Sequence, residues 1–238
     1  MAGKHAGRRH RDERSLTAVA LHRSLCSLAL VVLAGCTTPN LDPGPTSPVG
    51  PSGFPCPSYI VSSGSPRAGD TSGRVQVGAV SYPAAPSPYQ PVDSAEYLPF
   101  ANLVGSQRAV VEPATATSMG WESVVALARL SSVDGAWGTA QAAEVVAECS
   151  LSQAWRGIDY RPTVSRDEAL TVDGHEGWIR ITTLDFAVPG VKTTSEVQTV
   201  VVIRVRDETY AYLSYLPGSA PNLRPIVDAT REGLRVNS

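Results

Sequence analysis

Histidine and metal-binding motifs are scarce in this chain of 238 residues, and their scarcity narrows the chemistry it can perform. Three of the 4 histidines lie in the first 22 residues, which leaves His175 in the body of the chain. There is no C-x-x-C pair, no D-x-D-x-D-G loop and no glycine-rich phosphate-binding loop. Neither a zinc site nor an EF-hand calcium site can be assembled from local spacing, so we expect no metal and no cofactor.

Candidate catalytic groups are equally few. A Ser–His–acid hydrolase would have to use His175, but no G-x-S-x-G elbow exists, and we interpret this histidine as a strand-edge residue. The acidic pairs Asp167-Glu168 and Asp207-Glu208 are adjacent in sequence. Because neighbours on a strand point to opposite faces, we interpret them as solvated turn residues and predict that the chain is not an enzyme.

The chain also lacks an apolar run that would span a membrane. Residues 24–35 are apolar or small, and as a helix these twelve residues would reach about 18 Å, short of the roughly 30 Å hydrocarbon core of a bilayer. Residues 1–23, which precede them, contain six Lys and Arg and two acids. A basic segment, a short apolar core and small residues at its end are typical of a secretory signal.

The end of this apolar core, Leu33-Ala34-Gly35-Cys36, resembles the lipobox of bacterial lipoproteins at every position. The resemblance implies a diacylglycerol on the Cys36 sulfur, cleavage before Cys36, acylation by fatty acids such as palmitate, and a membrane anchor. Two or three acyl chains anchor a protein stably in a bilayer, whereas a single chain binds it only marginally. We therefore expect residues 1–35 to be a signal peptide and the protein to lie on the extracytoplasmic face of the cell membrane. The alternative is an ordinary signal with a coincidental cysteine.

The predicted mature chain is acidic. It keeps fourteen Lys and Arg against twenty Asp and Glu, a net charge of −6, which argues against nucleic acid as a partner. One lysine, Lys192, stands against thirteen arginines. This balance, with many Ala, Gly and Pro residues, is typical of a GC-rich genome and indicates an actinobacterial source.

Residues 36–73 are expected to form a lipidated tether. From Thr37 to Gly73, 25 of 37 positions are Pro, Gly, Ser or Thr, a composition that cannot bury enough apolar area to offset the cost of ordering. Threonines near prolines in this segment are possible O-glycosylation sites by composition alone. Residues 74–238 have the size of one domain with its own core.

The sequence of residues 74–238 predicts mostly strands. The expected strands are 74–82, 106–111, 121–130 (for which a helix is the alternative), a run before the Asp173-Gly174 hairpin turn, 177–188, 196–205 and 209–216. A helix is expected over 136–155 with Asp134 as its N-cap. A second helix follows Pro217–Pro221, with Pro225 in its first turn and Gly233 as its C-cap. This succession predicts an α+β fold, an antiparallel sheet with helices packed on it.

A second resemblance covers about 60 residues, 177–236. The segments GWIRITTL at 177–184 and VQTVVVIRVRDETYAYLSYLPG at 197–218, followed by a closing helix that ends in LRV, resemble the C-terminal half of PsbP-like domains. That superfamily includes LpqN-type lipoproteins of the actinobacterial envelope. The resemblance implies an α/β/α sandwich and an accessory or assembly protein that binds other proteins, generally without catalysis. It supplies no active-site residues.

Two cysteines, Cys56 and Cys149, remain beside the lipid-bearing one. Outside the cytoplasm an even count favours a disulfide, which would place the start of the ordered domain near Phe54. The alternative is a buried helix thiol at Cys149 and a free thiol at Cys56.

Seven aromatic residues are candidates for lining a groove, although such residues more often form a core: Trp121, Trp137, Trp155, Trp178, Tyr210, Tyr212 and Tyr215. The sequence predicts a lipid-anchored, non-catalytic binding or assembly factor of the cell envelope with a protein partner. The alternative is a carrier or sensor of a small apolar or glycolipid ligand in the cell wall. An enclosed cavity with apolar walls would favour the carrier, and a flat exposed aromatic patch would favour the protein partner.

Overall fold

The structure is a computed structural model that describes Cys56 and residues 70–71, 73–92, 98, 100–130 and 137–237. All of these belong to one compact unit, Pro45–Ser238. The predicted signal peptide (1–35), the lipid attachment residue Cys36 and most of the predicted tether (36–73) lie outside the described residues. In the described part of the chain, no helix has the length and apolar character that a membrane crossing requires.

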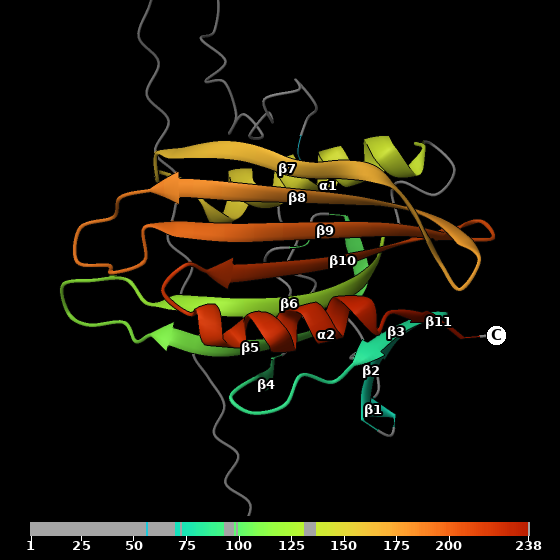
Figure 1. The fold of residues 1–238 in the computed structure, drawn as a ribbon, viewed down its shortest axis with the longest axis horizontal. Coiled ribbons are helices and arrows are strands. Elements are labelled where there is room, and N and C mark those ends of the chain that lie inside the picture. Colours follow the sequence, from blue (N-terminus) through green and yellow to red (C-terminus); the bar gives the residue numbers. More distant parts are fainter. Residues whose placement is uncertain are drawn as a thin grey trace, which may run out of the picture. The chain divides into compact units, whose positions relative to one another are not determined.

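A seven-stranded antiparallel sheet forms the centre of the fold (Figure 1). Its strands lie in the order β4, β5, β6, β10, β9, β8, β7. Strands β7 to β10 form a meander that includes the strands predicted over 177–188, 196–205 and 209–216, and β10 pairs it with β6. The strand predicted over 121–130 is confirmed as a strand. The bounds are β4 Gln90–Val92, β5 Ala101–Glu112, β6 Trp121–Leu130, β7 Tyr160–Val172, β8 His175–Phe186, β9 Ser195–Val205 and β10 Glu208–Pro217.

Two tight turns set the register of the meander. Asp173 and Gly174 join β7 to β8 with φ of +48° and +81°, both positive as a type I′ turn requires, so the predicted hairpin is confirmed. The turn between β9 and β10 consists of Arg206 and Asp207 alone, and Arg206 has φ of +56°. Glu208, which we assigned to this turn, is already the first residue of β10.

Helix α1, Thr139–Ala154, covers one face of the sheet through a stripe of small and β-branched side chains. Its buried residues include Ala142, Val145, Val146 and Cys149, which follow one another at helical spacing. The helix begins three residues later than predicted, since Gly138 is its N-cap. The expected N-cap, Asp134, lies outside the described residues.

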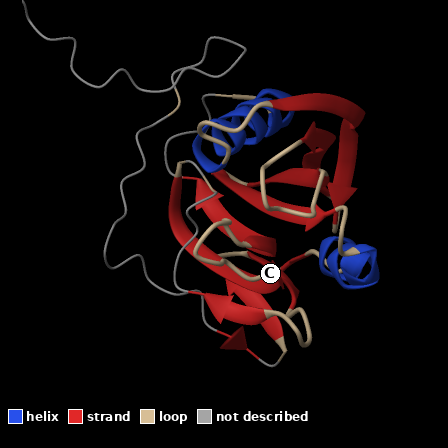
Figure 2. Cartoon of the chain, turned by 90° about the vertical axis from the view of Figure 1, so that its left-hand side faces the viewer, coloured by secondary structure: helices blue, strands red, loops and turns tan. Residues whose placement is uncertain are grey.

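The opposite face carries helix α2, Arg224–Glu232, and a small four-stranded sheet, as Figures 1 and 2 show. Pro225 lies in the first turn of α2 and Gly233 is its C-cap, as predicted. The small sheet has the order β1, β2, β3, β11, and a 3-10 turn precedes α2. The bounds are β1 Asp70–Thr71, β2 Arg74–Val77, β3 Val80–Pro83, β11 Arg235–Val236 and the 3-10 turn Pro221–Leu223.

Two sequence predictions need correction here. The single strand predicted over 74–82 is a hairpin, because Gly78 with φ of +54° turns the chain between β2 and β3. The α+β class with helices on an antiparallel sheet is confirmed, but α2 shares its face with the small sheet. The fold is therefore richer in sheet than the α/β/α sandwich that we expected.

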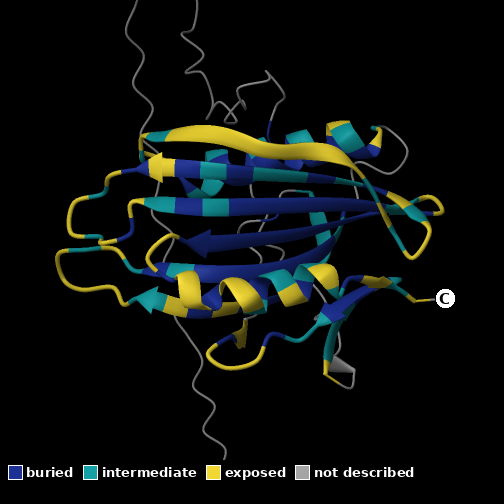
Figure 3. Ribbon diagram, viewed as in Figure 1, coloured by how far each residue is buried: buried dark blue, intermediate teal, exposed yellow. Residues whose placement is uncertain are grey.

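The central strands β9 and β10 are buried on both faces, whereas β7 at the edge is exposed along most of its length (Figure 3). Successive side chains alternate between two cores. Val200 and Val202 pack under α1, and Val201 and Ile203 pack under α2 and the small sheet. Both faces of the sheet thus contribute apolar burial, which is the main favourable term in folding.

Candidate functional site

An apolar cavity of about 560 Å³ lies where β5 ends and β6 begins, on the face of the sheet that α1 covers. Small-molecule sites have volumes of about 300–1,000 Å³, so the cavity is large enough for one organic ligand. Its walls come from β5 and the loop after it, β6, β9, β10 and the end of α1. The lining residues are Val110, Glu112, Pro113, Ala114, Met119, Gly120, Trp121, Glu122, Val124, Ala154, Trp155, Ile158, Glu196 and Tyr215.

The inner wall is a packed aromatic cluster. The ring of Trp121 stacks on Phe186, with centroids 4.8 Å apart and an angle of 16°. Trp155 packs edge-on against both, at 5.5 Å from Trp121 and 4.6 Å from Phe186. Because these rings hold one another in fixed orientations, the wall is preformed and needs no ordering when a ligand enters.

The cavity has an apolar rim, which we define as Val110, Pro113, Ala114 and Met119. Val110 is 62% exposed and Met119 is 50% exposed. Large apolar side chains exposed together at a cavity mouth favour contact with an apolar molecule.

Glu196, the second residue of β9, lies inside the cavity wall and is only 4% exposed. Trp121 Nε1 donates a hydrogen bond of 2.6 Å to Glu196 Oε2. Burial raises the pKa of this carboxyl to about 8, and the indole hydrogen bond opposes that rise. At neutral pH Glu196 is therefore mainly a neutral carboxylic acid, able to donate as well as accept a hydrogen bond.

The other two acidic residues of the cavity lie nearer the surface. Glu112 accepts hydrogen bonds from Thr193 Oγ1, at 2.5 Å, and from the backbone N–H groups of Lys192 and Thr193, at 2.8 and 2.7 Å. These bonds, that of the Thr193 hydroxyl first, lower the pKa of Glu112, which stays ionised. They also tie the end of β5 to the loop between β8 and β9. Glu122 forms an ion pair of 3.2 Å with Arg108.

The described residues that line the cavity include no Lys, Arg or His. Among the described residues, no group of three or more His, Cys, Asp or Glu side chains is arranged to hold a metal ion. Chemically, the cavity offers apolar and aromatic contact and one buried hydrogen-bonding carboxyl.

The structure brings three of the seven predicted aromatic residues, Trp121, Trp155 and Tyr215, to this cavity. The other four lie elsewhere. Tyr210 and Tyr212 belong to the core on the opposite face. Trp137 packs edge-on against Phe100, and Trp178 donates a hydrogen bond of 2.6 Å to Asp167.

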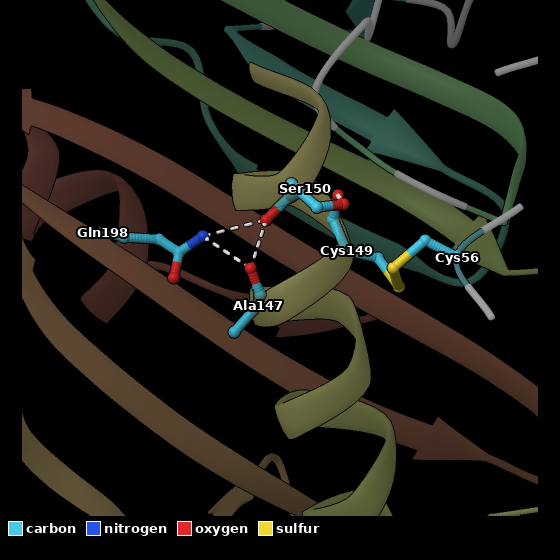
Figure 4. Close-up of a disulfide and its surroundings, with 6 residues drawn as sticks. Cys56, Ala147, Cys149, Ser150 and Gln198 are labelled. Atoms are coloured by element: carbon cyan, nitrogen blue, oxygen red, sulfur yellow. Dashed lines mark hydrogen bonds between the residues drawn. A yellow bond between two sulfur atoms is a disulfide. The ribbon is translucent and has the colours of Figure 1, made fainter. Parts of the chain in front are cut away.

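Cys56 and Cys149 form a disulfide with Cα atoms 5.2 Å apart, the pairing that the even cysteine count favours (Figure 4). Both residues are fully buried. Gln198 of β9 donates hydrogen bonds to Ala147 O, at 3.2 Å, and Ser150 Oγ, at 2.8 Å. The disulfide fixes α1 to Cys56, which therefore belongs to the domain and not to the tether predicted over 36–73, and the amide of Gln198 fixes α1 to the sheet beneath it.

The candidate catalytic residues do not converge with the cavity. His175 is the first residue of β8, and in the described part of the chain no hydrogen bond joins its side chain to a Ser, Asp or Glu. Asp167 and Glu168 lie within the exposed strand β7, not in a turn as we expected. Asp207 is exposed in its turn, and Glu208 pairs with Arg129 at 2.7 Å. That the chain is not an enzyme stays a prediction.

Glu196 is the functional residue that the sequence analysis missed. The signal was the alternation in EVQTVVVIRV, which places Glu196 on the same face as Gln198, Val200 and Val202. A charged residue that heads an apolar strand face usually reaches solvent at the strand end. Here the indole of Trp121 donates a hydrogen bond to it, and the residue is only 4% exposed.

Comparison with known proteins gives weak likenesses. No protein-family model matches the chain, and no curated protein matches it in sequence. Among solved structures it is similar to the cyanobacterial PsbP of Synechocystis sp. PCC 6803, with 14% identity, a TM-score of 0.45 and coverage of 66% of this chain and 86% of that chain.

Two further solved structures are similar to a comparable extent. LpqN of Mycobacterium tuberculosis, described as involved in cell envelope biogenesis, has 14% identity, a TM-score of 0.41 and coverage of 67% of this chain and 83% of that chain. The Ran-binding protein Mog1p of Saccharomyces cerevisiae has 12% identity, a TM-score of 0.40 and coverage of 67% and 90%. With every TM-score below 0.5, these likenesses are too weak to support an argument about family or function.

Proposed function

We propose that this protein is a non-catalytic binding protein of the cell envelope that holds a small apolar ligand in the cavity between β5, β6 and the end of α1. The observation that carries the proposal is a preformed volume of about 560 Å³ with aromatic walls and one buried carboxyl. The cavity is partly open to solvent and so is not the enclosed one that the sequence analysis set as the mark of a carrier, but its apolar walls and aromatic inner wall favour a small apolar ligand. A flat exposed aromatic patch would have favoured the protein partner.

The location of this function is the second part of the proposal. Acylation at Cys36 would hold the domain, which we take to be PsbP-like, on the extracytoplasmic face of the membrane by its tether. Two observations support it. The lipobox-like sequence Leu33-Ala34-Gly35-Cys36 follows an apolar core, and the buried disulfide Cys56–Cys149 suits an oxidising compartment.

A second candidate function is binding of an envelope protein, and the exposed edge strand β7 favours it. An unpaired edge can receive a strand from a partner. However, Pro162 removes a donor, and a register shift between Val164 and Arg166 interrupts the ladder. Such features are typical of edges protected against strand addition, and we therefore prefer the cavity.

The cavity proposal can be tested with the predicted mature chain, residues 36–238, carrying Cys36→Ala, which lacks both the apolar signal core and the acylated cysteine and so needs no detergent. Nile red, a neutral dye that fluoresces in apolar surroundings, should bind with one site per chain. Ala154→Phe places a ring in the cavity and should abolish binding. Ala140→Phe changes the same helix away from the cavity and should leave binding intact. Equal binding by both variants would refute the assignment.

The anchor needs a separate experiment in cells. A fatty-acid analogue should label the wild-type chain and should not label Cys36→Ala. If both chains incorporate the analogue equally, the lipid attachment site is wrong, and the cavity proposal is unaffected.

A further inference from the structure

We propose that the cavity selects neutral apolar molecules whose head group accepts a hydrogen bond, such as an acyl ester, that Glu196 donates this bond, and that anionic amphiphiles are rejected. This inference rests on the proposed function and adds the chemical class of the ligand.

The first step is the hydrogen-bond arrangement of Glu196. The indole N–H of Trp121 is a donor only, so Glu196 Oε2 must accept in their 2.6 Å hydrogen bond. In the neutral acid the proton then belongs on the other oxygen, Oε1. No hydrogen bond joins Oε1 to a described residue, and Oε1 is not one of the fully buried unpartnered atoms of the described residues, so it keeps contact with the open space of the cavity. A ligand carbonyl in the cavity can therefore reach the Oε1 proton and replace water as its acceptor.

The second step is the charge of the cavity. Its ionisable lining residues are Glu112, Glu122, Glu196 and Tyr215, and Arg108 is already paired with Glu122 at 3.2 Å. A carboxylate or phosphate head group would enter an apolar space beside these acids, with no cation of the lining to compensate it. Burying an unpaired charge is strongly unfavourable, so anionic head groups should be excluded from the cavity.

The third step concerns cations, which an acidic aromatic cavity could also attract. A cation–π site requires an open ring face within about 6 Å of the cation. The face of Trp121 is stacked on Phe186 at 4.8 Å, and Trp155 packs edge-on against both rings. Since one face of Trp121 is taken up by Phe186 and Glu196 is mainly neutral at pH 7, the cavity attracts a cation less, and it fits a neutral head group better.

The inference also predicts a pH dependence, because only the protonated form of Glu196 can donate. Burial raises its pKa to about 8. Glu112, which also lines the cavity, does not change its ionisation in this pH range. Glu112 is ionised well below neutral pH because Thr193 and the Lys192 N–H hold its carboxylate. Ester binding should therefore weaken by about tenfold from pH 6.5 to pH 9, in proportion to the protonated fraction.

The test uses three ten-carbon amphiphiles that compete with Nile red on the Cys36→Ala chain: methyl decanoate, decanoate and decylammonium. At pH 6.5 methyl decanoate should bind at least about tenfold more tightly than decanoate, which corresponds to 1.4 kcal/mol or more. Glu196→Gln keeps a neutral donor of similar shape. Its affinity for methyl decanoate should stay within about threefold of the parent and should no longer change between pH 6.5 and pH 9.

The outcomes separate this inference from the proposed function. If Nile red does not bind at all, the proposed function fails. If Nile red binds but decanoate competes as well as methyl decanoate, only the selectivity inference fails. It also fails if decylammonium binds most tightly, or if ester affinity of the parent chain is the same at both pH values. The comparison of ester affinity at the two pH values uses only the parent chain. It therefore tests the inference even if Glu196→Gln fails to fold.

Discussion

The hydrogen bond of 2.6 Å from Trp121 Nε1 to Glu196 Oε2 joins β6 to β9 across β10, the strand that lies between them. The two residues are 75 positions apart in the sequence. This one contact places a protonated carboxyl in the wall of the cavity and fixes the ring that forms that wall. The stability of the fold and its ligand preference should therefore depend on the same pair.

The first prediction concerns the pH dependence of stability. Glu196 has a pKa of about 8 in the folded chain and an ordinary one of 4.5 when unfolded. Between these values the folded state holds a proton that the unfolded state has lost, so raising the pH favours unfolding. The free energy of unfolding should fall by about 1.4 kcal/mol per pH unit in this window. Urea titrations from pH 5 to pH 8 measure the slope.

Glu196→Gln is the control for this slope, since it cannot ionise and should flatten the curve above pH 5. Glu112 and Glu208 have lowered pKa values, and the stability that they contribute is lost only as the pH falls below about 4.5. Their effect therefore lies outside the window. An unchanged slope in Glu196→Gln would contradict the assignment.

The second prediction compares two indole–carboxyl hydrogen bonds of equal length. Trp121 donates at 2.6 Å to buried Glu196, and Trp178 donates at 2.6 Å to Asp167 on the surface. Trp121→Phe leaves a buried acceptor without its donor and should cost about 1–3 kcal/mol. Trp178→Phe lets water replace the donor and should cost less, about 1 kcal/mol. Chemical denaturation of both variants measures the difference, and equal losses would show that Glu196 is not effectively buried.

The third prediction concerns the disulfide Cys56–Cys149, which closes a loop with a sequence separation of 93 residues. In the chain-entropy account such a bridge stabilises the fold by about 4–5 kcal/mol. The double variant Cys56→Ala, Cys149→Ala should lose an amount of this order in denaturant unfolding. Cys56→Ala alone should lose nearly as much, because either change opens the loop. A loss below about 1 kcal/mol would show that the bridge does not constrain the unfolded chain.

The sequence was informative where a pattern is local. The strand over 196–205, the type I′ turn at Asp173-Gly174 and the C-cap Gly233 all follow from side-chain alternation or turn chemistry within a few residues. The strand over 121–130 is buried on both faces and does not alternate, which is why its residues fitted a helix as well. The hairpin at Gly78 was missed because Gly78-Ala79 is a weak turn dipeptide inside a continuous apolar alternation. The cavity was not predictable, since its walls come from four parts of the sequence that lie far apart, within 110–124 and 154–158 and at Glu196 and Tyr215.

The fourth prediction tests the turn at Gly78, whose φ is +54°. A Cβ there would lie 2.5 Å from Tyr210 Oη, the hydroxyl that accepts a hydrogen bond from the Ala79 N–H and donates one to Glu208. Gly78→Ala therefore adds a steric clash to backbone strain and should cost about 1–3 kcal/mol.

Gly73→Ala separates these two costs, since Gly73 has φ of +79° with nothing within 4 Å of the added Cβ. It should carry the backbone strain alone and lose less than Gly78→Ala. In a Tyr210→Phe background, which removes the clashing oxygen, the loss from Gly78→Ala should approach that from Gly73→Ala. Thermal and urea unfolding of the wild type, Gly78→Ala, Tyr210→Phe and the double variant completes a double-mutant cycle. If Tyr210→Phe leaves the cost of Gly78→Ala unchanged, the contact between β10 and the β2–β3 turn is not what fixes glycine at this position.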